Sequence, residues 1–528
     1  MQFLGSFLKI ILLIGITTWL AACGGGGGES DSSNESSNWL PGVFLDAITF
    51  FRQCANPRIG INPFTNQPFL DMQGSITDEN NFLRSYSNDT YLWYDEIIDR
   101  DPSIYGDPVS YFDLLKTTAI TPSGQPKDKF HGTIPSDEWF QLSQSGVSSG
   151  YGATFIILSS IPPREVLVAY TEPNSPATDP LVNISRGARI LSIDGVDIND
   201  NTQGGIDVLN TGLFPASAGE THAFQVLDRG AQQGRMVTMT SANVTSVPVQ
   251  DTSVLNTITG RVGYLVFNDH IATAEAALIN AVNQLNSGAG IDDLILDLRY
   301  NGGGFLDIAS ELAYMIAGPV PTAGQPFETL QFNNKHPITN PVTGQPLSPT
   351  PFYNTALGFS SPNGQMLPTF NLSRVFVITG PNTCSASESI MNSLRGVNIE
   401  VIQIGSTTCG KPYGFYPTDN CGTTYFTIQF RGVNALNYGD YTDGFSPQNT
   451  SLNAGALVPG CSVADDFTAL LGDPTEGRLA AALNYRDTQT CPFPSGISIP
   501  GKLKSERILS AADGFVLKNK WLTNRILR

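Results

Sequence analysis

Ser385 and Lys411 are the residues of this chain whose types and spacing best suit nucleophilic catalysis. Ser385 lies in the segment TCSASE (383–388), directly after the apolar run 375–378, and a second apolar run, 401–404, leads to the segment CGK (409–411). A serine hydroxyl is a weak nucleophile that needs a base beside it. A lysine amine can be that base when it is neutral, a state that burial away from carboxylates favours. The order of strand, serine, helix, strand and lysine therefore predicts a serine/lysine dyad that attacks amide bonds.

Each member of this dyad also has a structural interpretation. Ser385 and Glu388 have the spacing of a capping box, which would satisfy amides at a helix start. That role is compatible with catalysis, because a helix N-terminus provides a positive potential. Lys411 could be a surface lysine in a turn, but no acidic residue follows it before Asp419, so its local sequence lacks a charge that would hold the amine protonated.

Two other nucleophile systems are open. Cys384 could be the nucleophile itself, although an oxidising compartment would consume its thiol. A serine–histidine triad would have to use one of four histidines, and His270, which follows the apolar run 261–267, is the best placed of them. A surface histidine at a strand end is the simpler interpretation of His270.

The first 22 residues have the layout of a signal peptide, with Lys9 before a short apolar stretch and small residues before the cut. The segment LAAC (20–23) resembles a bacterial lipobox, which implies that Cys23 is lipidated and that residues 23–38, rich in Gly and Ser, form a flexible tether. We therefore expect a lipid-anchored protein of the bacterial cell envelope. Because no aspartate follows Cys23, the outer membrane, facing the periplasm, is the expected location.

Six further cysteines remain, at positions 54, 384, 409, 421, 461 and 491. An even number in an exported protein predicts disulfides, but six cysteines allow 15 pairings. A Cys384–Cys409 bridge would hold the candidate site together, whereas Cys409–Cys421 and Cys461–Cys491 are equally open. None of the spacings is that of a zinc site, and we expect neither a metal nor another cofactor.

Composition limits the partners. Of 528 residues, 41% are hydrophobic and 14% charged, which is typical of folded domains, two to four of them at this length. The net charge of −18 argues against nucleic acid, whose phosphates demand a basic surface.

The pattern along the chain predicts a multidomain α/β protein. Residues 39–145 are expected to be mostly helical, with apolar and aromatic residues at helical spacing from Glu79 to Ile98. Residues 146–247 carry strand and turn signals, and residues 248–450 alternate strands with helices. A C-terminal extension, 451–528, ends in a basic stretch that either contacts anionic lipid or is simply solvated.

The block 146–247 resembles a PDZ domain, through its segments SPA (175–177) and GARILSIDG (187–195). The resemblance implies that a peptide adds to the domain as an extra strand and that backbone amides capture its C-terminal carboxylate. We place that carboxylate at Gly150, Tyr151 and Gly152. A simple Gly-rich turn is the alternative.

Together with DLRYNGGG (297–304), SASE (385–388) and GK (410–411), this block resembles the C-terminal processing proteases of family S41. The resemblance implies a crotonase-like α/β peptidase domain in which Ser385 is the nucleophile, Lys411 the base, and Gly303 and Ala386 the oxyanion donors, with the glycine register open by one residue. It implies a serine endopeptidase that cleaves polypeptides near their C-terminus. Phe415 stands where the family usually has a glutamine that orients the lysine. An inactive scaffold that binds peptide C-termini is therefore the alternative.

Overall fold

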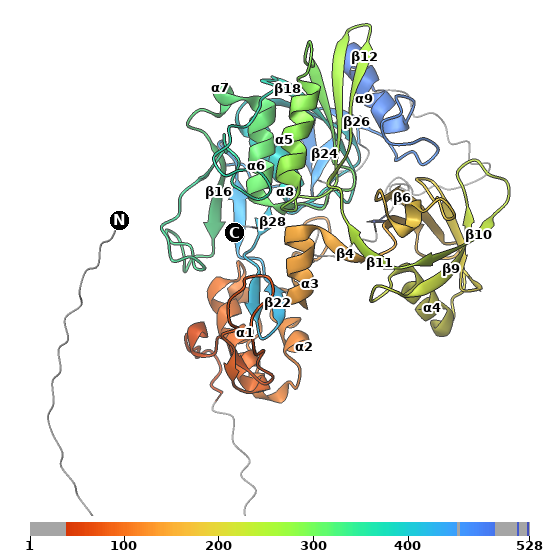
Figure 1. Ribbon diagram of the computed structural model, residues 1–528. Helices are drawn as coiled ribbons and strands as arrows, with labels where there is room; N and C mark the ends of the chain where they lie inside the picture. The colour runs from red at the N-terminus through yellow and green to blue at the C-terminus, as the bar shows by residue number, and fades with distance from the viewer. Residues whose placement is uncertain (1–38, 451–454, 492–514, 517–524, 527–528) are drawn as a thin grey trace, which may run out of the picture. The chain divides into compact units, whose positions relative to one another are not determined.

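The structure, a computed structural model, describes residues 39–450, 455–491, 515–516 and 525–526. The predicted signal peptide, Cys23 and the tether therefore lie outside the described residues, as does most of the extension 451–528. The described chain is a mixed α/β protein with several sheets (Figure 1), which confirms the expected fold class at that level. Within the described ranges, no helix is long and apolar enough to cross a bilayer.

A six-stranded sheet forms the centre of the region that holds Ser385 and Lys411. Its order is β12-β13-β14-β18-β19-β26, parallel throughout except for the antiparallel pair β12–β13. The strands are β12 (Val249–Thr257), β13 (Gly260–Phe267), β14 (Asp293–Asp297), β18 (Arg374–Thr379), β19 (Glu400–Gly405) and β26 (Gly460–Ser462). The apolar runs of the sequence are these strands, because both faces of a mostly parallel sheet are buried.

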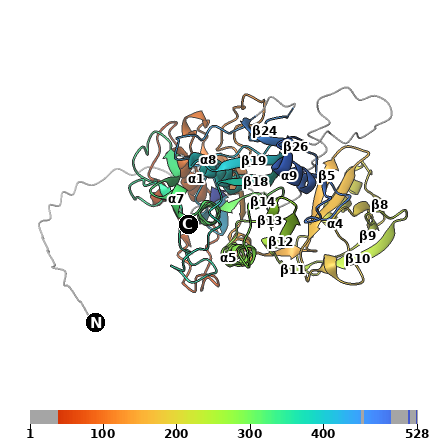
Figure 2. The same ribbon diagram turned by 90° about the horizontal axis from the view of Figure 1, so that it is seen from above.

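Helices cover both faces of this sheet: α5, α6 and α8 are grouped together (Figure 1) and pack in one core, whereas α9 packs in the other. Seen from above, α5 and α8 lie on one side of the strands and α9 lies on the other (Figure 2). Strand residues alternate between the two cores, as in β14, where Leu294 and Leu296 pack with the first group and Ile295 packs with α9. The helices are α5 (Ala274–Leu285), α6 (Leu306–Ala317), α8 (Ala386–Gly396) and α9 (Gly477–Thr488).

A second sheet lies between the N-terminal region and the central sheet in sequence. Its order is β10-β9-β7-β6-β5-β27, with β8 paired to β7, and α4 packs on its core beside Phe224. Its elements are β5 (Ala153–Ser159), β6 (Glu165–Thr171), β7 (Arg189–Ile193), β8 (Val196–Asp197), α4 (Gln203–Leu213), β9 (Thr221–Leu227), β10 (Arg235–Thr240) and β27 (Phe515–Val516). A separate pair, β4 (Val147–Gly150) and β11 (Ala242–Thr245), flanks it in sequence.

The N-terminal region combines helices with short strands. Helix α1 begins after Ser75, whose hydroxyl accepts from the Asp78 N–H, and it ends at Thr90. The helix expected from the apolar pattern between Glu79 and Ile98 therefore ends earlier than predicted, at Thr90. Tyr91 is extended, and its buried ring packs against the core of the central region. The other elements are β1 (Gln53–Cys54), β2 (Met72–Gln73), α2 (Pro108–Phe112), β3 (Gly132–Pro135) and α3 (Ser136–Phe140).

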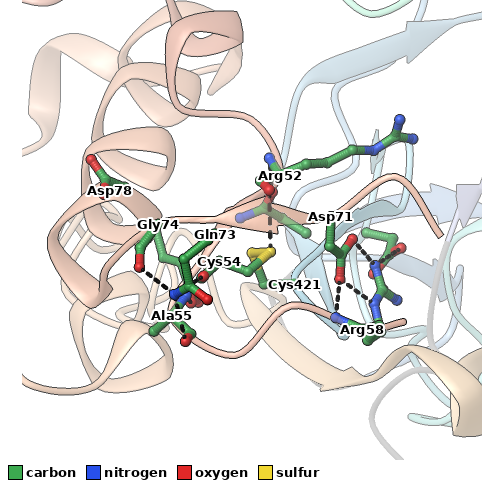
Figure 3. Close-up of a disulfide and its surroundings, with 12 residues drawn as sticks. Arg52, Cys54, Ala55, Arg58, Asp71, Gln73, Gly74, Asp78 and Cys421 are labelled. Carbon is green, nitrogen blue, oxygen red and sulfur yellow. Dashed lines mark hydrogen bonds and ion pairs between the residues drawn. A yellow bond between two sulfur atoms is a disulfide. The ribbon is translucent and has the colours of Figure 1, made fainter. Parts of the chain in front are cut away.

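A disulfide fixes this region to the later part of the chain. Cys54, at the end of β1, is bonded to Cys421 (Figure 3). Close by, the Arg58 guanidinium bridges Asp71, at 2.7 Å, and Asp419, at 2.9 Å. The strand β3 completes a small sheet with β22 (Thr423–Phe426) and β21 (Thr418–Asn420), so covalent, ionic and backbone links coincide.

The stretch 318–370, rich in proline and glycine, includes strand β16 (Pro326–Phe332), which pairs with β23 (Phe430–Val433). In turn, β23 pairs with β20 (Tyr413–Gly414), which begins two residues after Lys411. The remaining elements are β15 (Gly304–Phe305), α7 (Pro319–Thr322), β17 (Thr350–Pro351), β24 (Phe445–Pro447), β25 (Ala456–Val458) and β28 (Arg525–Ile526).

Candidate active site

Ser385 occupies a strained turn between a strand and a helix. Strand β18 ends at Thr379, and Ser385 is the residue that precedes α8, with φ 59° and ψ −113°. A positive φ is costly for a residue with a β-carbon and persists only where the surrounding structure enforces it. A sharp strand-to-helix turn of this kind presents the serine of a nucleophile elbow.

The Ser385 hydroxyl is buried and has no hydrogen-bond partner within the described part of the chain. Its backbone N–H donates to Glu388 Oε2 at 2.9 Å. Of the two hydrogen bonds expected in a capping box, the one from the Ser385 N–H to the Glu388 side chain is therefore formed, and the Ser385 hydroxyl takes no part in the other. The hydroxyl is left available for another role.

The Glu388 carboxylate joins the serine turn to the lysine loop. Its Oε2 accepts from the N–H of Ser385 at 2.9 Å and from the N–H of Lys411 at 2.8 Å, so the two backbone nitrogens share one oxygen. Its Oε1 accepts from the Gly410 N–H at 2.8 Å and from Thr408 Oγ1 at 2.5 Å. Burial raises the pKa of Glu388, and these four donors act against that rise. The sequence suggested only a cap for Glu388, because its contacts with 408–411 depend on the fold.

Lys411 is fully buried among aromatic rings. Its Nζ lies 4.3 Å from the centre of the Phe130 ring and 5.0 Å from that of Phe415. Gly410 has φ 80°, and a β-carbon there would lie 2.1 Å from the Thr442 carbonyl oxygen, so only glycine fits before the lysine. Phe415, at the position expected for an orienting glutamine, thus contacts the amine through its ring.

A disulfide is the second link between the two segments. Cys384, immediately before Ser385, is bonded to Cys409, two residues before Lys411, and their Cα atoms are 5.2 Å apart. Cys461 is bonded to Cys491, and Cys421 is bonded to Cys54, so the open alternative Cys409–Cys421 is wrong. Cys384 has no free thiol and is not the nucleophile. Although Cys384, Glu388 and Cys409 lie close enough to suggest a metal site, the two sulfurs are bonded to each other.

The glycine turn after β14 supports the serine turn from the other side. The Asn301 carbonyl accepts from the Cys384 N–H and from Ser387 Oγ, both at 3.1 Å. The Gly303 N–H donates to Asn301 Oδ1 at 2.9 Å, whereas Ala386 opens α8, where amides have no partner within the helix. Gly303 and Gly304 have φ 104° and 134°, and this backbone is open only to glycine.

His270 lies against this turn and is fully buried, so its expected surface position is wrong. Burial lowers its pKa to about 3, so the ring is neutral near pH 7. Nδ1 lies 3.0 Å from Asn301 Oδ1 and must be the donor, because an amide oxygen only accepts. Nε2 then carries a lone pair, and it has no hydrogen-bond partner within the described residues. The His270 N–H also donates to the Gly303 carbonyl at 3.1 Å, which makes this histidine a support for the glycine turn.

A buried charge network holds the strand end from which that turn starts. Arg299 binds Asp297 at 2.8 Å, Asp465 at 2.7 Å and Glu476 at 2.7 Å. Arg186, in the loop before β7, reaches Asp465 at 2.7 Å and Tyr300 Oη at 2.5 Å. Although burial acts in the opposite direction, the two guanidiniums hold the pKa of Asp465 well below its usual range. The second sheet is thereby connected to the turn that supports Ser385.

The predicted carboxylate loop leads into the edge of the second sheet. Gly150 ends β4, Tyr151 is buried with its hydroxyl donating to the Gly212 carbonyl at 3.0 Å, and Gly152 precedes β5. Gly152 has φ 73°, and a β-carbon there would lie 2.2 Å from Cβ of Ser175. The backbone at position 152 thus passes so close to Ser175 that only glycine fits there.

Residues 261–415, which include the glycine turn, Ser385 and Lys411, match the family model of peptidase family S41. A carboxyl-terminal-processing protease of Picosynechococcus sp. is 28% identical over 281 residues, which are 51% of this chain and 56% of that protein. The match thus spans little more than half the length of that relative. A crystal structure of a Bacteroides fragilis protein assigned to the S41 proteases has a TM-score of 0.57 at 22% identity, covering 78% of this chain and 97% of the other. At this level of sequence identity, the similarity to the Bacteroides fragilis structure shows a shared fold.

Proposed function

Since residues 261–415 match the family model of peptidase family S41, we propose that this chain is a serine endopeptidase with Ser385 as nucleophile and Lys411 as base. The observation that carries the proposal is the shared Glu388 carboxylate, which brings the backbone of both residues to one oxygen atom. Two further observations support it: the strained Ser385 hydroxyl has no hydrogen-bond partner among the described residues, and Lys411 is completely buried, which disfavours a charged amine.

The proposed reaction has two steps. The neutral Lys411 amine takes the Ser385 proton while Oγ attacks the carbonyl carbon of the scissile bond. The N–H of Ala386 then stabilises the oxyanion together with that of Gly304, the glycine register shifted by one residue, because the Gly303 N–H already donates to Asn301 Oδ1. Loss of one such donor typically costs about 100- to 1000-fold in rate. The C–N bond breaks as the leaving amine receives the proton from Lys411. Water hydrolyses the acyl-enzyme by the same proton transfers.

The test uses Ser385→Ala and Lys411→Ala, each checked for folding, with unstructured polypeptides of apolar C-terminus as substrates. We expect hydrolysis to fall by at least 1000-fold in both variants. Ser393→Ala is the matched control, because that hydroxyl is also buried, lies on the same helix and has no hydrogen-bond partner among the described residues. Unchanged hydrolysis by both dyad variants would eliminate the mechanism.

We further propose that the second sheet is a PDZ-like domain that holds the substrate's C-terminus at Gly150–Gly152. Its five-stranded core with α4 alongside, and the glycine-dependent approach at Gly152, support this assignment. The measurement is the binding of one peptide with a free and with an amidated C-terminus. Equal affinities would refute carboxylate capture.

The cell-envelope location is proposed from the N-terminal pattern around Cys23 and from the three disulfides, which favour an exported protein. Lipid attachment at Cys23, tested by labelling with a radioactive fatty acid, should vanish in Cys23→Ala. Labelling that survives this substitution would contradict the anchor.

An inactive peptide-binding scaffold is the second candidate, favoured by Phe415 in place of an orienting polar group and by the absence of a bond from Ser385 Oγ to Lys411. A serine-directed fluorophosphonate probe separates the two. A scaffold would leave Ser385 unlabelled, whereas the enzyme would be labelled and inactivated together.

A further inference from the structure

Two short strands close to the C-terminus of the chain pair with backbone edges in two different places. β27 (Phe515–Val516) lies antiparallel to β5, with Phe515 opposite Ile157 and Val516 opposite Ile156. β28 (Arg525–Ile526), nine positions after Val516, lies parallel to β15, with Arg525 opposite Gly304.

The first edge belongs to the sheet that carries the PDZ-like features. Among the described strands, β5 has β6 on one side and β27 alone on the other, so β5 would be the edge of the sheet without β27. An exposed edge strand is the usual place where a peptide adds by main-chain hydrogen bonds. The antiparallel direction carries β27 from Ile157 toward Ile156, that is, toward the loop Gly150–Gly152 that precedes β5.

The second edge lies beside the dyad. One side of β15 is taken by His270, since the Phe305 N–H donates to the His270 carbonyl at 2.8 Å and the His270 N–H donates to the Gly303 carbonyl. β28 takes the other side, and it also lies against β20, which begins two residues after Lys411. β15 itself follows Asn301, whose carbonyl holds the N–H of Cys384.

β28 is therefore flanked by the glycine turn that supports the serine and by the strand that follows the lysine. In the proposed mechanism the scissile carbonyl has to reach the N–H groups of Ala386 and the glycine turn, so an extended substrate would come to the same backbone edge at β15. Both pairings are only two residues long, and pairings of that length are marginal on their own. A longer polypeptide can therefore replace them.

From these two pairings we propose that the chain's own C-terminal segment is an intramolecular ligand of the peptide-binding edges at β5 and β15, which external polypeptides must displace. This inference rests on the proposed peptidase function for its consequence, which is lowered activity toward external substrates, but not for the binding itself.

The binding experiment uses the full chain with Ser385→Ala, so that nothing is cut, and a fluorescent synthetic peptide of residues 513–528 as the probe. Arg525→Pro with Ile526→Pro removes the backbone N–H groups of β28, whereas Arg525→Ala with Ile526→Ala retains them and is the matched control. Because one or two ladder hydrogen bonds are lost, we expect the proline variant to bind the probe about tenfold more tightly than the alanine variant. Affinities within twofold of each other, or weaker binding by the proline variant, would overturn the proposal.

Hydrogen exchange on the otherwise unmodified Ser385→Ala chain gives a second test that needs no proline. The amides of 515–516 and 525–526 should be protected, and an excess of an unstructured polypeptide should remove that protection. Protection that persists at saturation would show a permanent structural strand and would contradict displacement.

Activity separates this inference from the function on which it rests. With Ser385 intact, the proline variant should hydrolyse polypeptides about tenfold faster than the alanine variant at substrate concentrations below KM. Displacement without any hydrolysis would reject the peptidase and leave the ligand role standing. Equal hydrolysis by both variants would reject the ligand role alone.

Discussion

Removal of the Cys384–Cys409 disulfide tests whether the covalent link positions the proposed dyad of Ser385 and Lys411 or only stabilises the chain. This bond closes a loop of 25 residues that begins one residue before Ser385 and ends two residues before Lys411. In the chain-entropy treatment of the unfolded state, closing a loop of that length contributes about 3.5 kcal/mol to the free energy of unfolding. The double variant Cys384→Ala, Cys409→Ala should lose about that amount.

The Cys461–Cys491 disulfide provides a matched control, because it closes a loop of 30 residues and contributes about 3.6 kcal/mol by the same reasoning. It connects β26 to the segment directly after α9, and neither cysteine neighbours Ser385 or Lys411 in sequence. The two double variants should therefore be equally destabilised in urea.

Their activities should differ. Without the Cys384–Cys409 bond, the serine turn and the lysine loop are still joined by the Glu388 carboxylate and by the Cys409 N–H, which donates to the Thr383 carbonyl at 3.0 Å. These bonds are weaker than a covalent link, and a misplacement of about 1 Å typically costs about 100-fold in rate. We expect kcat/KM to fall by at least tenfold in this variant, assayed with a fluorogenic polypeptide where both variants are fully folded, and to stay within twofold for the Cys461/Cys491 variant. Equal losses of kcat/KM in the two variants, or no loss in either, would refute a positioning role.

Three further predictions concern buried charges. Glu388→Gln leaves at least one backbone donor, such as the Gly410 N–H, facing an amide group, so it should cost about 1–3 kcal/mol in urea unfolding and lower kcat/KM by about tenfold; unchanged values for both would contradict the shared-carboxylate argument. Burial, followed by the nearby Glu275, raises the pKa of Glu311 to about 9, so the parent protein should lose stability between about pH 4.5 and 9 by up to about 1.4 kcal/mol per pH unit. Glu311→Gln lacks that titration, and its stability relative to the parent should rise with pH; a constant difference from pH 5 to 8 would show that Glu311 is not protonated in the fold. Arg186→Met removes one partner from a buried ion pair with Asp465 and should cost about 3–5 kcal/mol, and a loss below 1 kcal/mol would show that Arg299 alone suffices.

The central elements could be predicted because their signals are local. The apolar runs 261–267, 375–378 and 401–404 correspond to the buried strands β13, β18 and β19. Their length and composition suffice to predict them, since a strand covered on both faces is apolar throughout.

The elements that were missed depend on partners distant in sequence. Helix α9 is weakly amphipathic, and its arginines read as surface residues, yet Arg478 and Arg486 are buried. Arg486 pairs with Asp293 at 2.6 Å, a partner 193 residues away that no local pattern indicates. The same holds for β27 and β28, whose two-residue pairings have no signature of their own.

The sequence proposes residues for the candidate site but gives no geometry for them. Motif order indicated Ser385 and Lys411, whereas the positive φ of Ser385 and the four bonds of Glu388 required the folded chain. His270 illustrates the limit, because a polar residue after a strand reads as exposed unless its buried partner, here Asn301, is known.

The strained backbone at Ser385 needs an external cause, since a serine with positive φ would relax if its neighbours allowed it. Three restraints act within one residue of it: the disulfide at Cys384, the Asn301 carbonyl on the Cys384 N–H, and Glu388 on its own N–H. Each restraint reaches a different part of the fold, namely the lysine loop, the glycine turn and helix α8. Two of the three, the disulfide and the Glu388 carboxylate, also bind the lysine loop. The contacts that strain Ser385 are therefore the same contacts that place Lys411. A chain that kept the strain without using the lysine would therefore bear its cost for no gain, which favours the dyad over a scaffold that has lost catalysis.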